Sequence, residues 1–107
     1  MQVNTTTTSG EPQSFTLSGN GAKGFMTVLV NKGKDQRRVR AYFNATFILA
    51  GDDNTEVTNM SIDWLDLRYT VKGKWEDYPK TNGRACVIEK MVKEELVSQS
   101  ADWYQVA

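Results

Sequence analysis

Arginine and aromatic side chains alternate with small and apolar ones along residues 37–49, in the segment RRVRAYFNATFIL. Guanidinium groups bind phosphate oxygens and aromatic rings stack on bases, so these residue types together suit contact with a nucleic acid. Because successive side chains of a β-strand point to opposite faces, we expect a long strand with one apolar and one polar face. The polar face would hold Arg38, Arg40, Tyr42, Asn44, Thr46 and Ile48, and the apolar face Val39, Ala41, Phe43, Ala45, Phe47 and Leu49.

Two further segments alternate in the same way and would extend the polar face. Residues 25–31 and 62–72 are expected to be strands, and the second has Leu65, Leu67 and Tyr69 on its inner face. If the three strands are neighbours, their outer side chains form an open platform that could bind single-stranded nucleic acid. An ordinary solvent-facing sheet is the alternative. The candidate binding residues are Thr27, Asn31, Arg38, Arg40, Tyr42, Asn44, Thr46, Trp64, Asp66 and Arg68, with arginines on phosphates, Tyr42 and Trp64 on bases, and Thr27, Asn44 and Thr46 as hydrogen-bonding groups.

The elements that would position this platform are strands first and a helix last. A short strand is expected over residues 14–18, followed by a flexible loop over 19–24, a polar hairpin loop over 32–36 and a turn over 50–57. After a connection over 73–80 the apolar period changes from 2 to 3.6, which predicts a helix over 84–98, capped near Thr81 or Asn82. A short second helical segment could follow over 101–106. The order indicates an α+β fold, an antiparallel meander with helix packed on one sheet face.

The expected helix is too small for its sheet. Fifteen residues span about 22 Å at 1.5 Å per residue, whereas the sheet has four expected strands, one of them 13 residues long. A chain of 107 residues is one domain with a small core of its own, and residues 1–12 would be a tail or a short N-terminal hairpin arm. We therefore expect an intertwined homodimer, with sheets joined and helices crossing onto the partner. The residues that would pack the helix are Ile88, Met91, Val92 and Leu96.

Composition argues against an enzyme. The chain has no histidine, which removes the commonest general base and metal ligand, and no catalytic, cofactor or metal site is expected. Cys86 is the only cysteine, which fits a cytosolic origin, and we expect it to be a buried or half-buried thiol. No apolar run approaches the roughly 18 residues of a membrane span. We therefore expect no membrane contact.

The net charge of zero hides an uneven distribution along the chain. Residues 1–49 carry six basic and two acidic side chains, for +4, and residues 50–107 carry seven basic and eleven acidic ones, for −4. One surface could therefore be strongly positive.

Three apparent motifs are weaker than they look. Gly19, Gly21 and Gly24 have the spacing of a dinucleotide site, but a strand rather than a helix follows, so a turn is expected. The acidic residues of segment 52–56 lack the spacing of a calcium loop. Asp63 and Asp66 are three residues apart on one strand, so they should lie on opposite faces.

The order of these segments resembles that of the coat proteins of single-stranded RNA bacteriophages, over about residues 25–96. FMTVLVNKGKDQRRVRAYFNATFIL is similar to that family's strand, basic loop and strand, NMSIDWLDLRYTVK to its last strand, and GRACVIEKMVKEELV to its first helix. In that family the sheet lines the shell and grips a hairpin of the genome, while the helices interlock with those of a partner. This chain departs from the pattern in its short N-terminal region, its short turn over 50–57 and the little chain after residue 98.

The resemblance implies a dimeric capsid protein that assembles into an icosahedral shell, packages single-stranded genomic RNA and resides in the virion after synthesis in the bacterial cytoplasm. It places contacts between dimers in a loop of Gly51, Asp52, Asp53, Asn54 and Thr55. Two other functions fit the same residues. One is a non-capsid dimer that binds single-stranded nucleic acid, and the other is a small phage or plasmid inhibitor that acts through an edge strand or the acidic turn.

Overall fold

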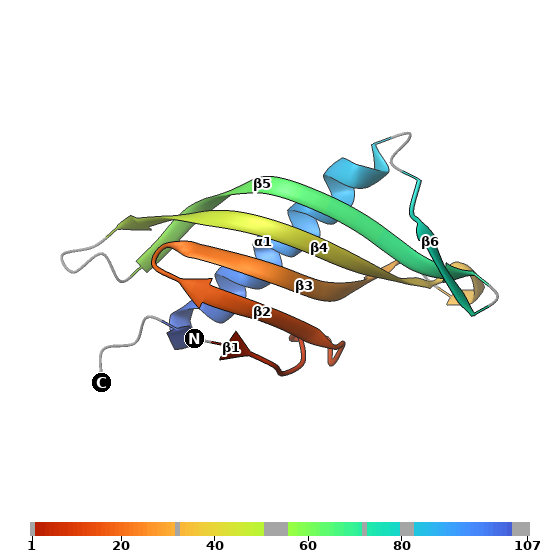
Figure 1. Ribbon diagram of the computed structural model, residues 1–107, viewed down its shortest axis with the longest axis horizontal. Coiled ribbons are helices and arrows are strands. Elements are labelled where there is room, and N and C mark those ends of the chain that lie inside the picture. Colours follow the sequence, from red (N-terminus) through yellow and green to blue (C-terminus); the bar gives the residue numbers. More distant parts are fainter. Residues whose placement is uncertain (1, 32, 51–55, 72, 80–82, 104–107) are drawn as a thin grey trace.

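One antiparallel sheet with a helix across one of its faces makes up this fold (Figure 1). The computed structural model describes residues 2–31, 33–50, 56–71, 73–79 and 83–103. Its six strands lie side by side in chain order: β1 (Gln2–Val3), β2 (Gln13–Ser18), β3 (Gly21–Val30), β4 (Arg37–Ala50), β5 (Glu56–Val71) and β6 (Lys74–Asp77). A 3-10 turn, η1 (Gly33–Asp35), joins β3 to β4, and α1 (Arg84–Trp103) ends the described chain. The predicted α+β meander with a C-terminal helix is confirmed.

Strands β4 and β5 are the longest, with 14 and 16 residues, and pair along nearly their whole lengths. The long strand predicted over 37–49 is confirmed as β4. β5 begins at Glu56, six residues before the predicted strand, so positions 50, 56 and 57 of the expected turn are strand. The proposed loop between dimers, residues 51–55, lies outside the described residues.

β3 begins earlier than predicted, because the glycine-rich loop is mostly strand. Only Gly19 and Asn20 form the turn, and Gly19 has the positive φ of 59° that such a turn requires. Gly24 pairs with Phe15, and a Cβ at Gly24 would overlap the backbone carbonyl oxygen of Ser14. That glycine is therefore needed for the close approach of β2 and β3, which periodicity alone does not reveal.

The core lies between the sheet and α1. The apolar faces of the strands meet a stripe on the helix that includes Ile88, Val92 and Leu96, each no more than 1% exposed, while Met91 is partly buried against them. These residues therefore pack α1 on the sheet of its own chain. The strand residues of the core are Phe15, Ala22, Met26, Val28, Val30, Val39, Ala41, Phe43, Ala45, Phe47, Met60 and Leu67.

The helix itself differs from the prediction at its end and at its cysteine. It runs to Trp103, so its 20 residues span about 30 Å, and residues 101–103 continue α1 instead of starting a second helix. Residues 104–107 and the predicted cap at 81–82 lie outside the described residues. Cys86 is exposed, contrary to expectation, because a position two residues before Ile88 faces away from the buried stripe.

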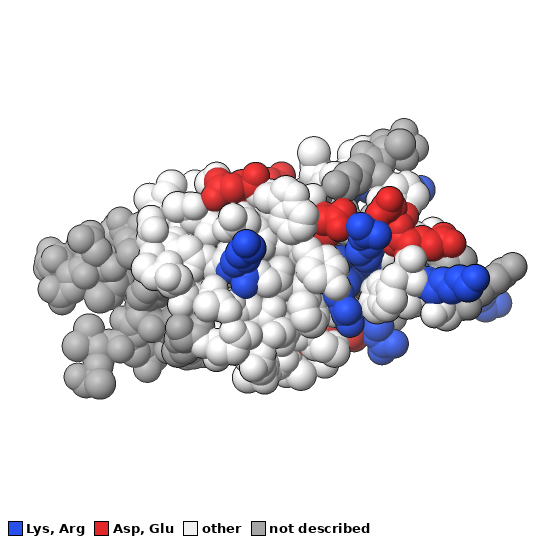
Figure 2. Space-filling model, in the orientation of Figure 1, with Lys and Arg blue, Asp and Glu red and all other residues white. Residues whose placement is uncertain are grey.

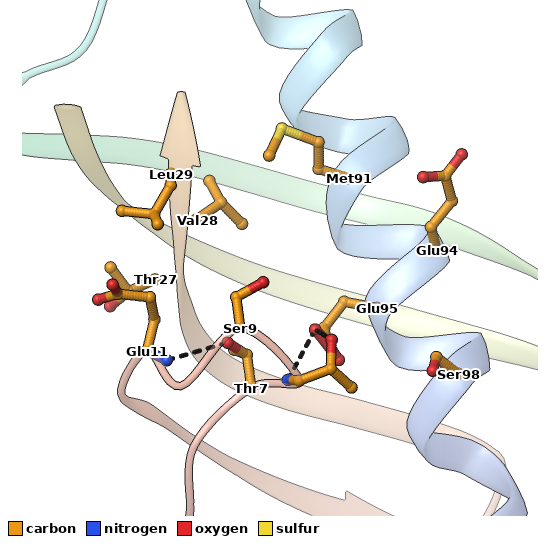
Figure 3. A pocket seen from close by; sticks show the side chains of 11 residues that line it. Thr7, Ser9, Glu11, Thr27, Val28, Leu29, Met91, Glu94, Glu95 and Ser98 are labelled. Atoms are coloured by element: carbon orange, nitrogen blue, oxygen red, sulfur yellow. Dashed lines mark hydrogen bonds between the residues drawn. The ribbon is translucent and has the colours of Figure 1, made fainter. Parts of the chain in front are cut away.

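The N-terminal residues fold back onto the sheet. β1 pairs with β2, an isolated bridge joins Thr6 to Pro12, and the loop between them lies beside the edge of β3 (Figure 3). Glu95 of α1 fixes this loop by accepting hydrogen bonds from the backbone N–H of Thr8 at 3.0 Å and from its hydroxyl group at 2.6 Å. The loop thus connects the helix with the strand edge.

Candidate nucleic-acid interface

The sheet face opposite α1, called the open face below, brings the outer side chains of β3, β4 and β5 together. The register places Phe25, Tyr42 and Asp66 side by side in one row, and the next row continues through Arg40, Arg68 and Asp77 on β6. Because the predicted strands are neighbours, the alternation read from the sequence does produce a continuous surface.

Arg40 has an unusual environment on this face. Its guanidinium carbon lies 4.5 Å from the ring centroid of Phe25 and 4.4 Å from that of Trp75, so the cation is stacked between two aromatic rings. An Nη1–H group points to the Tyr42 hydroxyl oxygen at 3.4 Å. The Nε atom is buried and has no hydrogen-bond partner among the described residues. A cation held in place without a carboxylate is suited to an incoming anion.

A hollow of about 430 Å³ opens beside Arg40, within the size range of small-molecule sites. Trp64 and Trp75 are 54% and 50% exposed, so two indole rings at the hollow are available for stacking. We call it the aromatic hollow, and its lining residues are Arg40, Tyr42, Trp64, Asp66, Arg68 and Trp75.

The other two arginines of the open face already have carboxylate partners. Nε of Arg38 lies 3.1 Å from Glu11, whose side chain is only 11% exposed. Arg68 contacts Asp66 through Nε at 3.0 Å and Asp77 through Nη1 at 3.1 Å. The hydrogen bond to Asp66, together with the negative charges of Asp66 and Asp77, raises the pKa of Arg68 above its usual value. Arg68 is therefore a charged group fixed by two acceptors.

The expected excess of positive charge does not occur on this face. Among its described residues, four cations stand against four carboxylates, because β5, β6 and the N-terminal loop bring acidic groups beside the arginines of β4. Figure 2 shows that charged side chains gather at the end carrying β6, while most of the remaining surface is uncharged. The cations are Lys23, Arg38, Arg40 and Arg68, and the carboxylates Glu11, Asp63, Asp66 and Asp77.

Two predicted binding residues do not join the platform. Thr27 is 8% exposed, because the N-terminal loop covers that part of β3 and Pro12 accepts a hydrogen bond from the Thr27 backbone N–H at 3.0 Å. Figure 3 shows Thr27 beside Glu11 of this loop. Asn31 follows the end of β3 with φ of 65°, which breaks the alternation, and it lines a different hollow together with Tyr78 and Arg84.

The far end of the open face holds the remaining predicted residues. Asn44 is exposed and pairs with Trp64, while the Thr46 hydroxyl group donates a hydrogen bond to Asp63 at 2.7 Å. A β-bulge at this point brings Asp63 onto the open face, so the expected separation of Asp63 and Asp66 on opposite faces is wrong. The hydrogen bonds from Thr46 and Ser61 lower the pKa of Asp63.

Phe25 and Trp75 are the important side chains that the sequence interpretation missed. Phe25 belongs to the same alternating set as Thr27, so extending that set by one position would have found it. Trp75 lies on β6, a four-residue strand within the segment 73–80 that the sequence predicts only as a connection. Gly73, with φ of 80°, marks the hairpin turn before β6 and was the available signal.

Other site types find no support among the described residues. No group of three histidine, cysteine, aspartate or glutamate side chains is placed to hold a metal ion there. No helix among the described residues is both long and apolar enough to cross a membrane. Comparison with protein-family models, with curated proteins and with solved structures found no match to this chain.

Proposed function

We propose that this chain is a coat protein of a single-stranded RNA bacteriophage. It would dimerise, assemble into a closed shell and hold genomic RNA on the open face, and it would reside in the virion after synthesis in the bacterial cytoplasm. The observation that carries the proposal is the cluster of Arg40, Tyr42, Trp64 and Trp75 on the sheet face opposite the helix. Single-stranded RNA is held by aromatic rings that stack on bases and by cations that meet phosphates.

The free edge of β5 supports a dimer with joined sheets. β6 pairs only with Arg68–Val71, so among the described strands residues 56–64 of β5 have a neighbouring strand on one side only. An unpaired edge of this length is a template for pairing with another chain. A second copy that aligned its own β5 there would produce one sheet of twelve strands, with both open faces on the same side.

The helix surface supports contact between copies as well. Val87 and Val97 are 59% and 39% exposed on α1, outside the stripe that packs on the sheet. Beside the first turns of α1 lies a hollow of about 630 Å³ whose lining includes Leu29, Tyr78 and Met91. Apolar surface of this kind is available for a partner's helix.

Electron microscopy of the purified chain, together with measurement of nuclease-protected RNA, tests the proposal. The wild-type chain should form uniform closed particles that protect RNA. The double variant Trp64→Ala/Trp75→Ala should still form particles but protect much less RNA, because its stacking rings are gone. Ile48→Ala is the matched control, since Ile48 is 53% exposed and lies outside the aromatic hollow. Small dimers that hold no RNA would refute the coat-protein proposal.

A non-capsid dimer that binds single-stranded nucleic acid is the second candidate. It is favoured by the equal numbers of cations and carboxylates on the open face, because bulk packaging of a genome benefits from an excess of cations. This function predicts that the chain binds RNA but remains a discrete dimer at every concentration in sedimentation experiments.

A further inference from the structure

Asp66 and Arg68 present an acceptor and a donor side by side within the aromatic hollow. The Asp66 side chain is 28% exposed, and its contact with Nε of Arg68 uses one of its two oxygens. A carboxylate offers about four acceptor positions, so Asp66 can accept further hydrogen bonds. Arg68 contacts its carboxylates through Nε and Nη1, and its Nη2 carries two more N–H groups.

This pair lies beside exposed rings. Trp64 is two residues before Asp66 on the same face of β5, and Tyr42 is directly opposite Asp66 on β4. A base stacked on Trp64 would therefore turn its edge toward Asp66 and Arg68. Single-stranded RNA is read in this way, by stacking and by hydrogen bonds to the Watson–Crick edge.

We infer that the aromatic hollow selects an unpaired guanine base. The Watson–Crick edge of guanine has one acceptor, O6, followed by two donors, N1–H and the N2 amino group. Arg68 donates to O6, and the two oxygens of Asp66 accept from N1–H and N2–H. The inference rests on the proposed binding of single-stranded RNA and adds the base that the site prefers.

The other bases match this arrangement less well. Uracil begins with the same acceptor and donor but ends in a carbonyl oxygen, which would face the Asp66 carboxylate. Adenine and cytosine present a donor to Arg68 and an acceptor to Asp66, so both contacts are lost. A hydrogen bond to a charged group corresponds to about a ten- to hundredfold change in affinity, which is the discrimination expected between guanine and uracil.

Binding of labelled RNA heptamers to the full chain, measured by fluorescence anisotropy, tests the inference. The probes are seven uridines and the same heptamer with guanosine, inosine, adenosine or cytidine at its centre. The guanosine probe should bind about ten- to a hundredfold more tightly than the all-uridine probe. Inosine lacks the N2 amino group but keeps O6 and N1–H, so its probe should bind more weakly than the guanosine probe.

Three variants locate the preference. Asp66→Asn should bind the guanosine probe no better than the uridine probe, and a cooperative transition in urea unfolding shows that this variant folds. Asp77→Asn should keep the preference, because Asp66 still holds Arg68. Asp63→Asn, another carboxylate of the open face, lies outside the hollow and should keep it as well.

The outcomes separate this inference from the proposed function. Equal binding of all heptamers would overturn the guanine inference and leave RNA binding intact. The same holds if Asp66→Asn weakens every probe equally, because Asp66 would then only support the fold. Failure of every heptamer to bind would overturn the proposed function together with the inference.

Discussion

Replacing Arg40 with methionine should separate stability from RNA binding. The Nε atom of Arg40 is buried and has no hydrogen-bond partner in the described part of the chain. Such a donor costs about 1–3 kcal/mol, because it keeps its full desolvation penalty. The stacking contacts with Phe25 and Trp75 each stabilise the folded state by about 0.5–1 kcal/mol. Methionine removes both effects and keeps a flexible stem that contacts the same rings with its sulfur atom. The free energy of unfolding of Arg40→Met should therefore stay within about 1 kcal/mol of the wild type or rise.

The effect on binding follows from the charges. Among the described residues Arg40 and Lys23 are the cations of the open face without a carboxylate partner, so about two phosphates should be neutralised. Each phosphate contributes a slope of about −0.7 in a plot of log affinity against log salt for single strands, which gives about −1.4 for the wild type and about −0.7 for Arg40→Met. If all four cations of the open face lacked carboxylate partners and contacted phosphates, the slope would be about −2.8.

Urea unfolding gives the stability, and fluorescence anisotropy of a labelled RNA heptamer between about 50 and 200 mM salt gives the slope. Lys90→Met is the matched control, since Lys90 is 78% exposed on α1 and its contact with Glu94 is 3.9 Å long. This control should leave both the stability and the slope unchanged. A loss of more than about 2 kcal/mol in Arg40→Met with an unchanged slope would refute the reasoning, because Arg40 would then be a structural residue.

Three further predictions concern the sheet that carries the site. Gly24→Ala should destabilise the fold by about 1–3 kcal/mol in urea unfolding, because the new Cβ overlaps the Ser14 carbonyl group, and a neutral result would contradict that close approach. Phe43→Ala should cost about 3–5 kcal/mol, since the ring is fully buried, and a loss below 1 kcal/mol would show that the core relaxes around the cavity. Thr46→Val should move the pKa of Asp63 upward toward its ordinary value of 3.8 in an NMR titration, because it removes the main hydrogen bond that lowers it. The lowered pKa contributes stability that is present above pH 3.8 and is lost as the pH falls through the folded-state pKa, so this part of the acid sensitivity should become smaller in Thr46→Val, where the hydrogen bond from Ser61 remains.

The sequence predicted those parts of the site that depend on regular alternation. Side chains alternate regularly between the two faces at these positions of β4 and β5. The open face therefore holds Tyr42, Trp64 and Asp66, as predicted from the alternation. The prediction was wrong where the backbone leaves that period. The bulge at Asp63 and the positive φ of Asn31 both change the face of a side chain, and neither follows from apolar patterning.

Contacts between distant segments could not be predicted either. The pairing of Arg38 with Glu11 joins residues 27 apart, and it depends on the path of the N-terminal loop. That same path buries Thr27, whose strand position alone suggested exposure. The stacking of Trp75 on Arg40 needs the turn at Gly73 to bring β6 back against β5. Charge counted along the chain therefore overestimated the positive charge of the surface.

The position of the site on the two longest strands explains how its side chains can be held in place. In the middle of β4, from residue 40 to residue 46, each outward residue lies between inward residues that are fully or almost fully buried, as Tyr42 does between Ala41 and Phe43. The packed core thus fixes the backbone beneath the aromatic hollow. Ligand binding therefore costs little backbone conformational entropy. β6 is different, because all four of its residues are exposed and its strand partners are limited to the end of β5. Changes on β6, such as Trp75→Ala, should therefore reduce binding with little effect on stability, whereas changes beneath β4 should alter both.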